Sequence, residues 1–292
     1  MSFLNLKKII LHIDKIFLYS FLIDSYVYLK YFIKIKKIYL NKNSKNYLIK
    51  KHNLDKELLV YLTSYHKRFS TLPLVLDSLQ NQTIKPDKIE LWIENNDVRF
   101  LPKNISYFKN VDIKICENNL YSYKKIIPAL IENQDRYIVT FDDDIIYPSN
   151  SLEQLVNKSK KNLGDIIANR VHNIKVINQM PDKYNNWYFN NAQNDNLNFF
   201  TGVGGVLYPP NCFHEDVTNK ELFKKLCPHG DDIWLNWMIK LNKKKLLYSG
   251  YNQQFTMIKG INSGLSRNNV KLFFNDEQIK RIIKKYGFPH LN

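Results

Sequence analysis

The sequence has few cysteines, none of them close together, and a deficit of acidic residues. Its three cysteines, Cys116, Cys212 and Cys227, are scattered along 292 residues without a CxxC pair. A disulfide framework needs more cysteines than this, and a cysteine zinc site needs them closer together. The sequence therefore excludes a small disulfide-stapled domain and a zinc cluster.

Long uncharged hydrophobic runs are also missing. Asp14, Lys15, Asp24 and Lys30 interrupt the apolar amino-terminal stretch. No run there approaches the roughly 18 uncharged residues that a membrane-spanning helix requires. The same interruptions, and the lack of a small-residue cleavage site, argue against a secretory signal peptide. We expect neither a transmembrane anchor nor a cleaved leader.

Positive charge is what the sequence has in excess. There are 43 Lys and Arg against 27 Asp and Glu, a formal net charge of +16, and 44% of the residues are hydrophobic. That hydrophobic fraction is enough to bury a large core and is too high for a disordered chain. The positive excess favours a nucleic acid, a membrane surface or a phosphate-bearing ligand as a partner.

The charge is concentrated at the amino terminus. Residues 1–52 carry eleven lysines and two aspartates, in a segment dense in Ile, Leu, Phe and Tyr. This pattern is typical of helices that lie on an anionic membrane surface. The alternative is that these helices pack on the main domain while their lysines face solvent.

From residue 58 onward, short apolar runs alternate with amphipathic stretches. The runs at 58–63, 88–94, 111–116 and 136–141 predict strands, and the stretches at 71–80 and 123–131 predict helices. The first two strands begin about thirty residues apart, which suits a βαβ crossover. The alternation predicts an α/β fold with a doubly wound sheet, in which ligands bind at the carboxyl ends of the strands.

Polar residues follow three of these strands at the edge where a ligand would bind. They are Thr63, Ser64, Tyr65 and Arg68 after the first strand, Glu94 and Asp97 after the second, and Asp142, Asp143 and Asp144 after the fourth. Because the carboxyl ends of parallel strands meet at one edge of a sheet, we expect these side chains to converge.

The three consecutive aspartates, Asp142 to Asp144, carry the strongest chemical signal. Adjacent carboxylates after a buried strand repel one another and raise their own pKa values unless a cation neutralises them. Hard oxygen ligands of this kind favour Mg²⁺ or Mn²⁺. The alternative is an acidic turn that caps the next helix, which Ser149-Asn150-Ser151 opens.

A strand at 137–141 followed directly by Asp142, Asp143 and Asp144 resembles the Asp-x-Asp signature of nucleotide-sugar-dependent glycosyltransferases of the GT-A fold, close to the bacterial family-two type. The resemblance covers roughly residues 57–245. It implies a GT-A-like mixed sheet flanked by helices, which would follow the helical basic segment that the charge pattern predicts at the amino terminus. It also implies a metal held by Asp144 and Asp142, and a ribose contact from Asp142 or Asp143.

The resemblance extends to the residues around this signature. In that fold the loop after the first strand holds the base and the diphosphate, and the residues Thr63, Ser64, Tyr65 and Arg68 are similar to it. The acidic residue that the family has after its second strand matches Glu94 or Asp97 here. Lys124 and Lys125 would add positive charge on the nucleotide side. Their alternative is a solvated helix face.

A glycine-rich run in the second half, residues 198–210, contains Gly202, Gly204 and Gly205 among apolar residues. Glycine weakens a strand unless backbone or a ligand must come close. A sugar ring lying against Gly204 and Gly205 would explain the missing side chains, and a β-bulge is the alternative.

A pair of aspartates then precedes an apolar helix predicted over 234–241. Asp231-Asp232-Ile233-Trp234-Leu235 resembles the Glu/Asp-Asp-x-x-Leu element of inverting GT-A enzymes. The resemblance places Asp231 in the acidic first position and makes Asp232 the catalytic base, which deprotonates the acceptor hydroxyl. The alternative is a helix N-cap.

A loop rich in Gly, Ser and Asn follows at 259–269, with Lys259 and Arg267 as its cations. In the GT-A fold a mobile loop after the core often closes over the diphosphate, which makes both residues candidates for donor binding. A plain surface loop is the alternative. The final segment predicts a basic helix over 276–286.

The expected organisation has three parts. They are an amphipathic membrane-interface segment at 1–52, a catalytic domain at 53–270 with a nucleotide-binding half (53–150) and an acceptor half (151–270), and a basic helix at 271–292. The expected activity is that of an inverting, metal-dependent glycosyltransferase of the hexosyltransferase type, using Mn²⁺ or Mg²⁺. It would move a sugar from a nucleotide donor, with a UDP-sugar favoured, to a hydroxyl of a surface glycan such as lipopolysaccharide, lipooligosaccharide or capsule.

The basic amino terminus fits a lipid-linked acceptor and a peripheral position on the cytoplasmic leaflet of the membrane. Two other functions rank lower. A sugar nucleotidyltransferase should carry a Gly-rich loop with Arg or Lys after the first strand, and residues 63–70 contain no glycine. A nucleic-acid-binding protein should not gather its basic residues in an apolar segment or place an acidic triplet at its ligand edge.

Overall fold

The computed structural model describes residues 26, 29, 33, 50–117, 120–251, 255–258 and 274–289. Most of the predicted amino-terminal segment, and the loop with Lys259 and Arg267, lie outside these residues. Within them, no helix is long and apolar enough to cross a bilayer. The helical residues Tyr26, Leu29 and Ile33 have exposed side chains.

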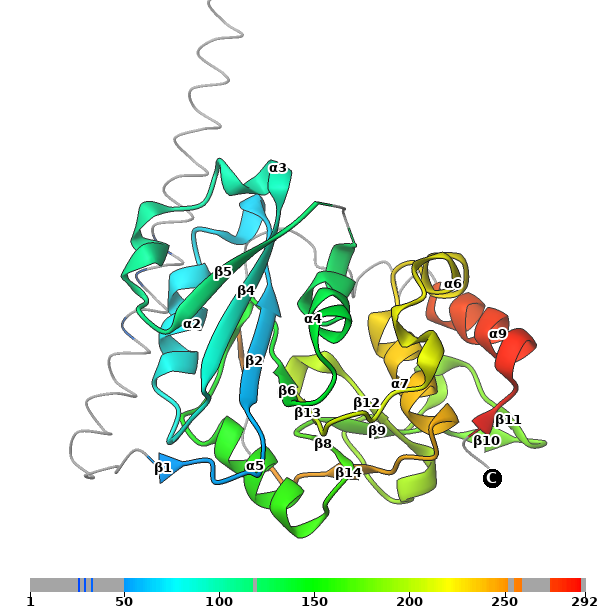
Figure 1. The fold of residues 1–292 in the computed structure, drawn as a ribbon. Coiled ribbons are helices and arrows are strands. Elements are labelled where there is room, and N and C mark those ends of the chain that lie inside the picture. Colours follow the sequence, from blue (N-terminus) through cyan, green and yellow to red (C-terminus); the bar gives the residue numbers. More distant parts are fainter. Residues whose placement is uncertain are drawn as a thin grey trace, which may run out of the picture.

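The centre of the protein is a seven-stranded sheet (Figure 1). Its strands, in spatial order, are β14 (Leu246–Tyr248), β8 (Ile166–Ala168), β13 (Val206–Tyr208), β6 (Tyr137–Thr140), β2 (Leu58–Thr63), β4 (Lys88–Glu94) and β5 (Val111–Cys116). Strand β13 is antiparallel to both of its neighbours, and all other pairs are parallel. The predicted α/β fold with a mixed, GT-A-like sheet is confirmed.

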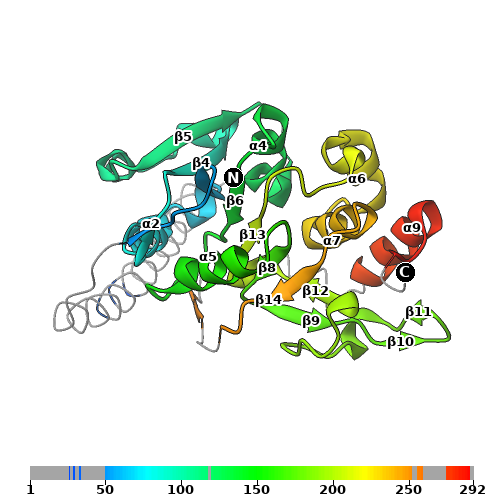
Figure 2. The same ribbon diagram turned by 60° about the horizontal axis from the view of Figure 1, so that its bottom comes forward.

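Helices cover both faces of this sheet (Figures 1 and 2). The helices are α2 (Leu72–Gln80), α3 (Asn95–Val98), α4 (Ile127–Glu132), α5 (Ser151–Lys161), α6 (Lys220–Leu226), α7 (Asp231–Leu241) and α9 (Phe274–Tyr286). Alternate residues of β2 enter two separate cores, because successive side chains of a strand point to opposite faces. One core includes α2 and α5, and the other includes α4 and α7.

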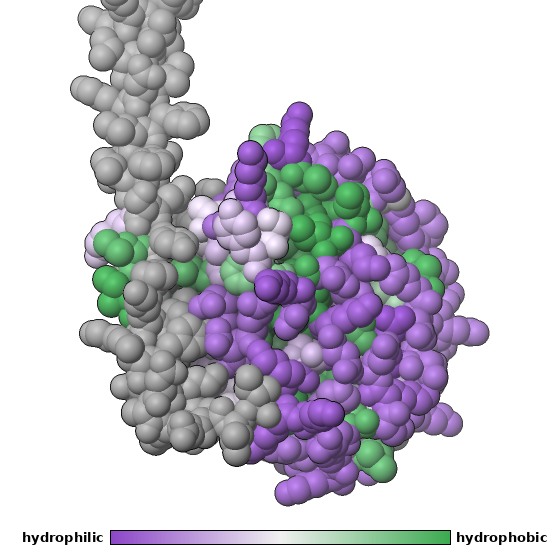
Figure 3. All heavy atoms as spheres, turned by 60° about the vertical axis from the view of Figure 1, so that its left-hand side comes forward, coloured by the Kyte–Doolittle hydropathy of each residue, from purple (hydrophilic) through white to green (hydrophobic). Residues whose placement is uncertain are grey.

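Short strands and 3-10 turns complete the described chain. The strand pairs are β1 (Lys50–Lys51) with β3 (Ile84–Lys85), β7 (Ile145–Ile146) with β15 (Thr256–Met257), β9 (Val171–Asn173) with β12 (Asn198–Phe200), and β10 (Val176–Ile177) with β11 (Met180–Pro181). The turns are His66–Arg68, Lys103–Tyr107, Tyr121–Lys125, Tyr184–Asn186, Asp195–Leu197, Gly202–Gly204 and Glu215–Thr218. The face of the domain in Figure 3 is largely hydrophilic and includes a hydrophobic area.

Two predicted helices have different bounds in the structure. The stretch at 123–131 is not one helix: a 3-10 turn, Tyr121–Lys125, precedes α4, which starts at Ile127. Pro128 has no N–H to donate to the preceding turn, so a continuous helix would lose a hydrogen bond there. Helix α7 begins at Asp231, three residues earlier than predicted, so both acidic residues lie in its first turn.

The predicted division into two halves stays a prediction, and the sheet joins the two halves. Strand β13, from the second half, pairs with β6, from the first half, with Val206 opposite Thr140. This pairing brings the turn before β13 next to the end of β6. Residues far apart in the sequence therefore meet at the carboxyl edge of the sheet.

Candidate active site

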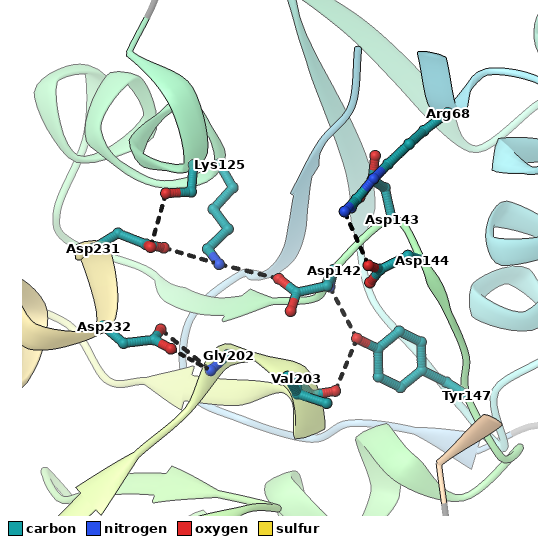
Figure 4. A network of polar contacts seen from close by, with 11 residues as sticks. Arg68, Lys125, Asp142, Asp143, Asp144, Tyr147, Gly202, Val203, Asp231 and Asp232 are labelled. Atoms are coloured by element: carbon teal, nitrogen blue, oxygen red, sulfur yellow. Dashed lines mark hydrogen bonds and ion pairs between the residues drawn. The ribbon is translucent and has the colours of Figure 1, made fainter. Parts of the chain in front are cut away.

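A cluster of five aspartates lies where β6, the turn before β13 and the start of α7 come together (Figure 4). Asp142, Asp143 and Asp144 follow β6, and Asp231 and Asp232 begin α7. This is the carboxyl edge of the parallel strands, where ligands bind in open α/β sheets. The structure therefore brings together the two acidic motifs that the sequence separates by almost ninety residues.

The three consecutive aspartates have different surroundings. Asp142 pairs with Lys125, and its backbone N–H donates to the hydroxyl of Tyr147 at 2.9 Å. Asp143 is buried against the guanidinium of Arg68. Asp144, which is more exposed, lies 3.1 Å from Nη2 of the same arginine.

Burial and mutual repulsion change the ionisation of these groups. Burial, and then the charge of Asp142, raise the pKa of Asp144 to about 6. Burial also raises the pKa of Asp143, although Arg68 opposes this effect. Burial acts to lower the pKa of Arg68, but Asp143 and Asp144 outweigh it, so the arginine stays charged. The triplet holds more negative charge than Arg68 alone neutralises.

Lys125 connects the two acidic motifs. Its Nζ lies 3.1 Å from Oδ1 of Asp142 and 3.0 Å from Oδ2 of Asp231, and its side chain is almost completely buried. Burial acts to lower the pKa of Lys125, but the charges of Asp142, Asp231 and Asp232 raise it well above the usual range. A buried ammonium is stable only with such partners.

Neither of the two adjacent lysines lies on a solvated helix face. Lys124 is also buried, and its Nζ lies 3.8 Å from Oε2 of Glu94. Both residues belong to a 3-10 turn, in which neighbouring side chains point in different directions. Lys124 therefore faces the end of β4, while Lys125 faces the aspartates.

Asp231 and Asp232 make contacts outside their own helix. Asp231 accepts a hydrogen bond of 2.8 Å from the hydroxyl of Ser122. Both carboxylate oxygens of Asp232 lie 3.2 Å from the backbone nitrogen of Gly202, which donates to them. Burial, and then the charge of Asp231, raise the pKa of Asp232 to about 7. The N-cap position belongs to Gly230, so neither aspartate is the helix N-cap.

Helix α7 is hydrogen-bonded to strand β12 one turn after Asp232. The side chain of Asn236 accepts a hydrogen bond of 3.1 Å from the N–H of Phe200 and donates one of 3.1 Å to its carbonyl. It also donates to the carbonyl of Asp232 at 2.7 Å. These bonds fix the position of Asp232 relative to β12. Sequence reasoning missed Asn236, because its partner lies 36 residues away.

The glycines of the turn before β13 are explained by close packing. A Cβ atom on Gly202 would lie 3.0 Å from Nζ of Lys125 and 3.3 Å from Oδ1 of Asp232. A Cβ atom on Gly204 would lie 2.9 Å from Arg170. Gly205 has a φ of +88°, and a Cβ there would lie 2.3 Å from the Phe141 ring. Contact of Gly204 and Gly205 with a sugar stays a prediction.

The predicted residues after the first two strands lie at the same edge but have separate roles. Thr63 donates to the carbonyl of Trp92 at 2.8 Å, and Ser64 is buried. The Arg68 guanidinium lies beside the Tyr65 ring, with Cζ of Arg68 5.6 Å from the ring centroid. Of the four residues Thr63, Ser64, Tyr65 and Arg68, only Arg68 forms an ion pair with the aspartate triplet.

The acidic residue after β4 has a partner that sequence reasoning did not select. Oδ1 of Asp97 lies 2.6 Å from Nδ1 of His66, whose ring lies 5.4 Å from that of Phe100. The only signal for His66 was its position in the polar run after β2. Tyr147 was also missed: its hydroxyl accepts from the N–H of Asp142 and donates to the carbonyl of Val203.

The residues present fit a metal that also binds a phosphate. Among the residues that the structure describes, no three His, Cys, Asp or Glu side chains are placed to hold a metal by themselves. Asp142 and Asp144 are both partly exposed, and the pKa of Asp144 is raised by burial and by Asp142. Mg²⁺ typically binds one or two carboxylates and completes its ligands with water and substrate phosphates. Two aspartates are enough for such a site.

Comparison with known proteins gives one family and several distant structural neighbours. Residues 60–215 match the model of the family described as Glycosyl transferase family 2. No curated protein matches the sequence. The chain is similar to S. aureus TarS 1-349, with 13% identity and a TM-score of 0.44, and the match covers 68% of this chain and 59% of that one.

Two further solved structures are similar at the same low level of identity. The match to 4-diphosphocytidyl-2C-methyl-D-erythritol synthase has 13% identity and a TM-score of 0.44, and it covers 76% of this chain and 100% of that one. The match to the mannosyltransferase PcManGT from Pyrobaculum calidifontis, in complex with GDP-Man and Mn2+, has 12% identity and a TM-score of 0.32. It covers 50% of this chain and 46% of that one.

The ionisation of Asp144 and Asp232 predicts how stability depends on pH. The folded-state pKa values, about 6 and about 7, lie above the ordinary 3.8. Between pH 4 and pH 7 the folded state thus holds protons that the unfolded state has lost, so the free energy of unfolding falls as pH rises. We expect Asp232→Asn to reduce this fall by up to about 1.4 kcal/mol per pH unit.

Urea unfolding at pH 5 and pH 7 in metal-free buffer measures the effect. Asp112→Asn removes an exposed carboxylate on β5 and is the control, for which the fall should equal that of the wild type. An unchanged fall in Asp232→Asn would contradict the raised pKa of Asp232.

Proposed function

The chain belongs to glycosyl transferase family 2, and on this basis we propose that it transfers a sugar from a nucleotide-sugar donor to a hydroxyl group of a glycan. The observation that carries the proposal is the buried lysine between two acidic motifs. Lys125 contacts both Asp142, at the donor motif, and Asp231, beside the proposed base. Groups suited to a diphosphate and a carboxylate suited to a hydroxyl therefore meet around one lysine.

On the donor side, the proposed roles follow the contacts of the triplet. Asp142 and Asp144 would hold Mn²⁺ or Mg²⁺, which when bound neutralises negative charge on the leaving diphosphate. Arg68 lies beside Asp143 and Asp144 and offers guanidinium nitrogens to a phosphate. The polar residues after β2, together with Asp97 and His66, border the region that a nucleoside would occupy. A UDP-sugar is the donor we propose.

On the acceptor side, Asp232 is the proposed general base. The most efficient base at neutral pH has a pKa close to 7, and burial and Asp231 raise the pKa of Asp232 to about that value. Its carboxylate would take the proton of the acceptor hydroxyl while that oxygen attacks the sugar from the side opposite the diphosphate. The N–H of Gly202 holds the carboxylate in place. The transfer would then invert the configuration at the sugar.

We further propose that the acceptor is a surface glycan carried on a lipid and that the protein binds the cytoplasmic leaflet peripherally. The support is the lysine-rich segment 1–52 and the exposed side chains of Tyr26, Leu29 and Ile33, which are 67%, 56% and 47% accessible. Their spacing of three and four residues places them on one side of a helix.

Vesicle binding tests this proposal. Co-sedimentation should be strong with phosphatidylglycerol vesicles and weak with phosphatidylcholine vesicles, and 0.5 M salt should reduce it. The double change Leu29→Asp and Ile33→Asp should weaken it about tenfold or more, because two buried apolar side chains are worth several kcal/mol at an interface. Leu163→Asp, at an exposed leucine of the domain, is the control. Equal binding of all three proteins would contradict the proposal.

The proposed chemistry predicts specific losses of activity. With UDP-sugars and an acceptor glycan, Asp232→Asn should lower kcat about 10²- to 10⁴-fold without weakening UDP binding, because it removes the base alone. Asp144→Ala, or a chelator, should abolish most turnover, and added Mn²⁺ should restore only the chelated wild type. The measurement is release of nucleoside diphosphate.

Asp112→Asn, an exposed carboxylate on β5, should retain wild-type turnover and serves as the matched control. Full activity in chelator or in Asp144→Ala would contradict the proposed metal site. Wild-type turnover by Asp232→Asn would remove the base assignment. Release of pyrophosphate in place of a nucleoside diphosphate would indicate a nucleotidyltransferase.

A further inference from the structure

The guanidinium of Arg170 forms one hydrogen bond, and none of the carboxylates that the structure describes is its partner. It follows β8 at the carboxyl edge of the sheet and is partly exposed. Its Nε donates to Oδ1 of Asn190 at 2.9 Å. Among the described residues, no protein group accepts a hydrogen bond from its Nη1 or Nη2, and no acidic residue forms an ion pair with it. Arg68, in contrast, pairs with two aspartates.

The partner of this guanidinium is anchored to a buried histidine. Asn190 has a left-handed backbone, with a φ of 51°, and its N–H donates to Nδ1 of His172 at 3.0 Å. His172 is buried in β9, and burial, and then the charge of Arg170, lower its pKa to about 3. A neutral His172 can accept this bond at every physiological pH. A buried histidine therefore anchors the backbone of Asn190, and the side chain of Asn190 accepts from Arg170.

The position of Arg170 places it on the acceptor side. Its Cβ packs against Gly204, at one end of the turn Gly202–Gly204, and its carbonyl accepts from the N–H of Thr201. Asp232 accepts from Gly202 at the other end of the same turn. Asp232 and Arg170 thus contact opposite ends of the three-residue turn Gly202–Gly204.

Two partly exposed aromatic residues directly precede Asn190, the hydrogen-bond partner of Arg170. Tyr188 and Phe189, directly before Asn190, are 46% and 42% accessible. The Phe189 ring packs edge-on against His172, with centroids 4.5 Å apart, so it is also fixed. Aromatic surface beside a few oriented polar groups is typical of a ligand site. A sugar ring can lie against these rings while a charged substituent reaches Arg170.

We propose that the guanidinium of Arg170 binds a carboxylate or phosphate group on the glycan that receives the transferred sugar. The proposal rests on the transferase function proposed above and adds the chemical class of the acceptor. A planar guanidinium whose Nη1 and Nη2 bind no described protein group matches the oxygens of either anion. The acceptor hydroxyl lies at Asp232, so the anionic group belongs to the same sugar or to its neighbour.

The test compares three sets of immobilised oligosaccharides with one common backbone: neutral, uronic-acid-bearing and phosphate-bearing. The full chain, a labelled UDP-sugar and Mn²⁺ are added, and sugar transfer is counted. The wild type should label a carboxylated or phosphorylated set at least tenfold better than the neutral set. The set that is labelled identifies which anion is recognised.

Variants separate recognition from folding. Arg170→Gln should lower kcat/KM for the anionic acceptor about 10- to 100-fold, the range for a hydrogen-bonded charge. Arg170→Lys keeps the charge but lacks the planar set of N–H donors, and Asn190→Ala removes the hydrogen-bond acceptor of the guanidinium. Both should lower kcat/KM by less than Arg170→Gln does. Arg281→Gln removes an exposed arginine from α9 and should change nothing.

Preferred labelling of neutral glycans, no labelling of any anionic glycan, or equal kcat/KM in Arg170→Gln would overturn the proposal. UDP binding by calorimetry distinguishes these outcomes from a failure of the proposed function. A wild type that neither binds UDP nor releases it from a UDP-sugar would contradict the transferase function itself.

Discussion

The buried ammonium of Lys125 is the interaction on which the arrangement of the site depends. Removing an ammonium from water costs several kcal/mol, and only nearby carboxylates compensate for it. Asp142 and Asp231 supply this compensation from two distant parts of the chain. A Cβ atom on Gly202 would lie 3.0 Å from Nζ of Lys125, and the backbone N–H of that glycine donates to Asp232. One cation thus pairs with both the donor motif and the residue beside the proposed base.

The charge balance of the site also suits a cationic ligand. Five aspartates, Asp142 to Asp144 with Asp231 and Asp232, surround two cations, Arg68 and Lys125 (Figure 4). Raised pKa values at Asp143, Asp144 and Asp232 show that burial and mutual repulsion disfavour full ionisation. A divalent cation with its diphosphate would relieve the repulsion at the exposed side of the triplet, and the buried side keeps Arg68 and Lys125.

Sequence patterns predicted the parts of the fold that depend on local order. The apolar runs at β2, β4 and β5 gave strand bounds that match the structure, and the sheet rule brought the acidic residues to one edge. Lys125 was harder, because a 3-10 turn points it inward where a helix would have left it solvated. Contacts such as Asn236 with Phe200 or Arg170 with Asn190 join positions with no shared motif, and only the packed chain reveals them.

The most direct test of this account is transfer kinetics of Lys125→Met beside Lys124→Met, each referred to the folded fraction. Both changes remove a buried lysine from the same turn, but Lys124 faces Glu94 and not the aspartates. We expect Lys125→Met to lower kcat about 10²-fold or more and also to weaken UDP-sugar binding, because both motifs lose their common partner. Lys124→Met should leave kcat within about tenfold of wild type. A folded Lys125→Met protein that binds donor and transfers sugar at the wild-type rate would contradict this account.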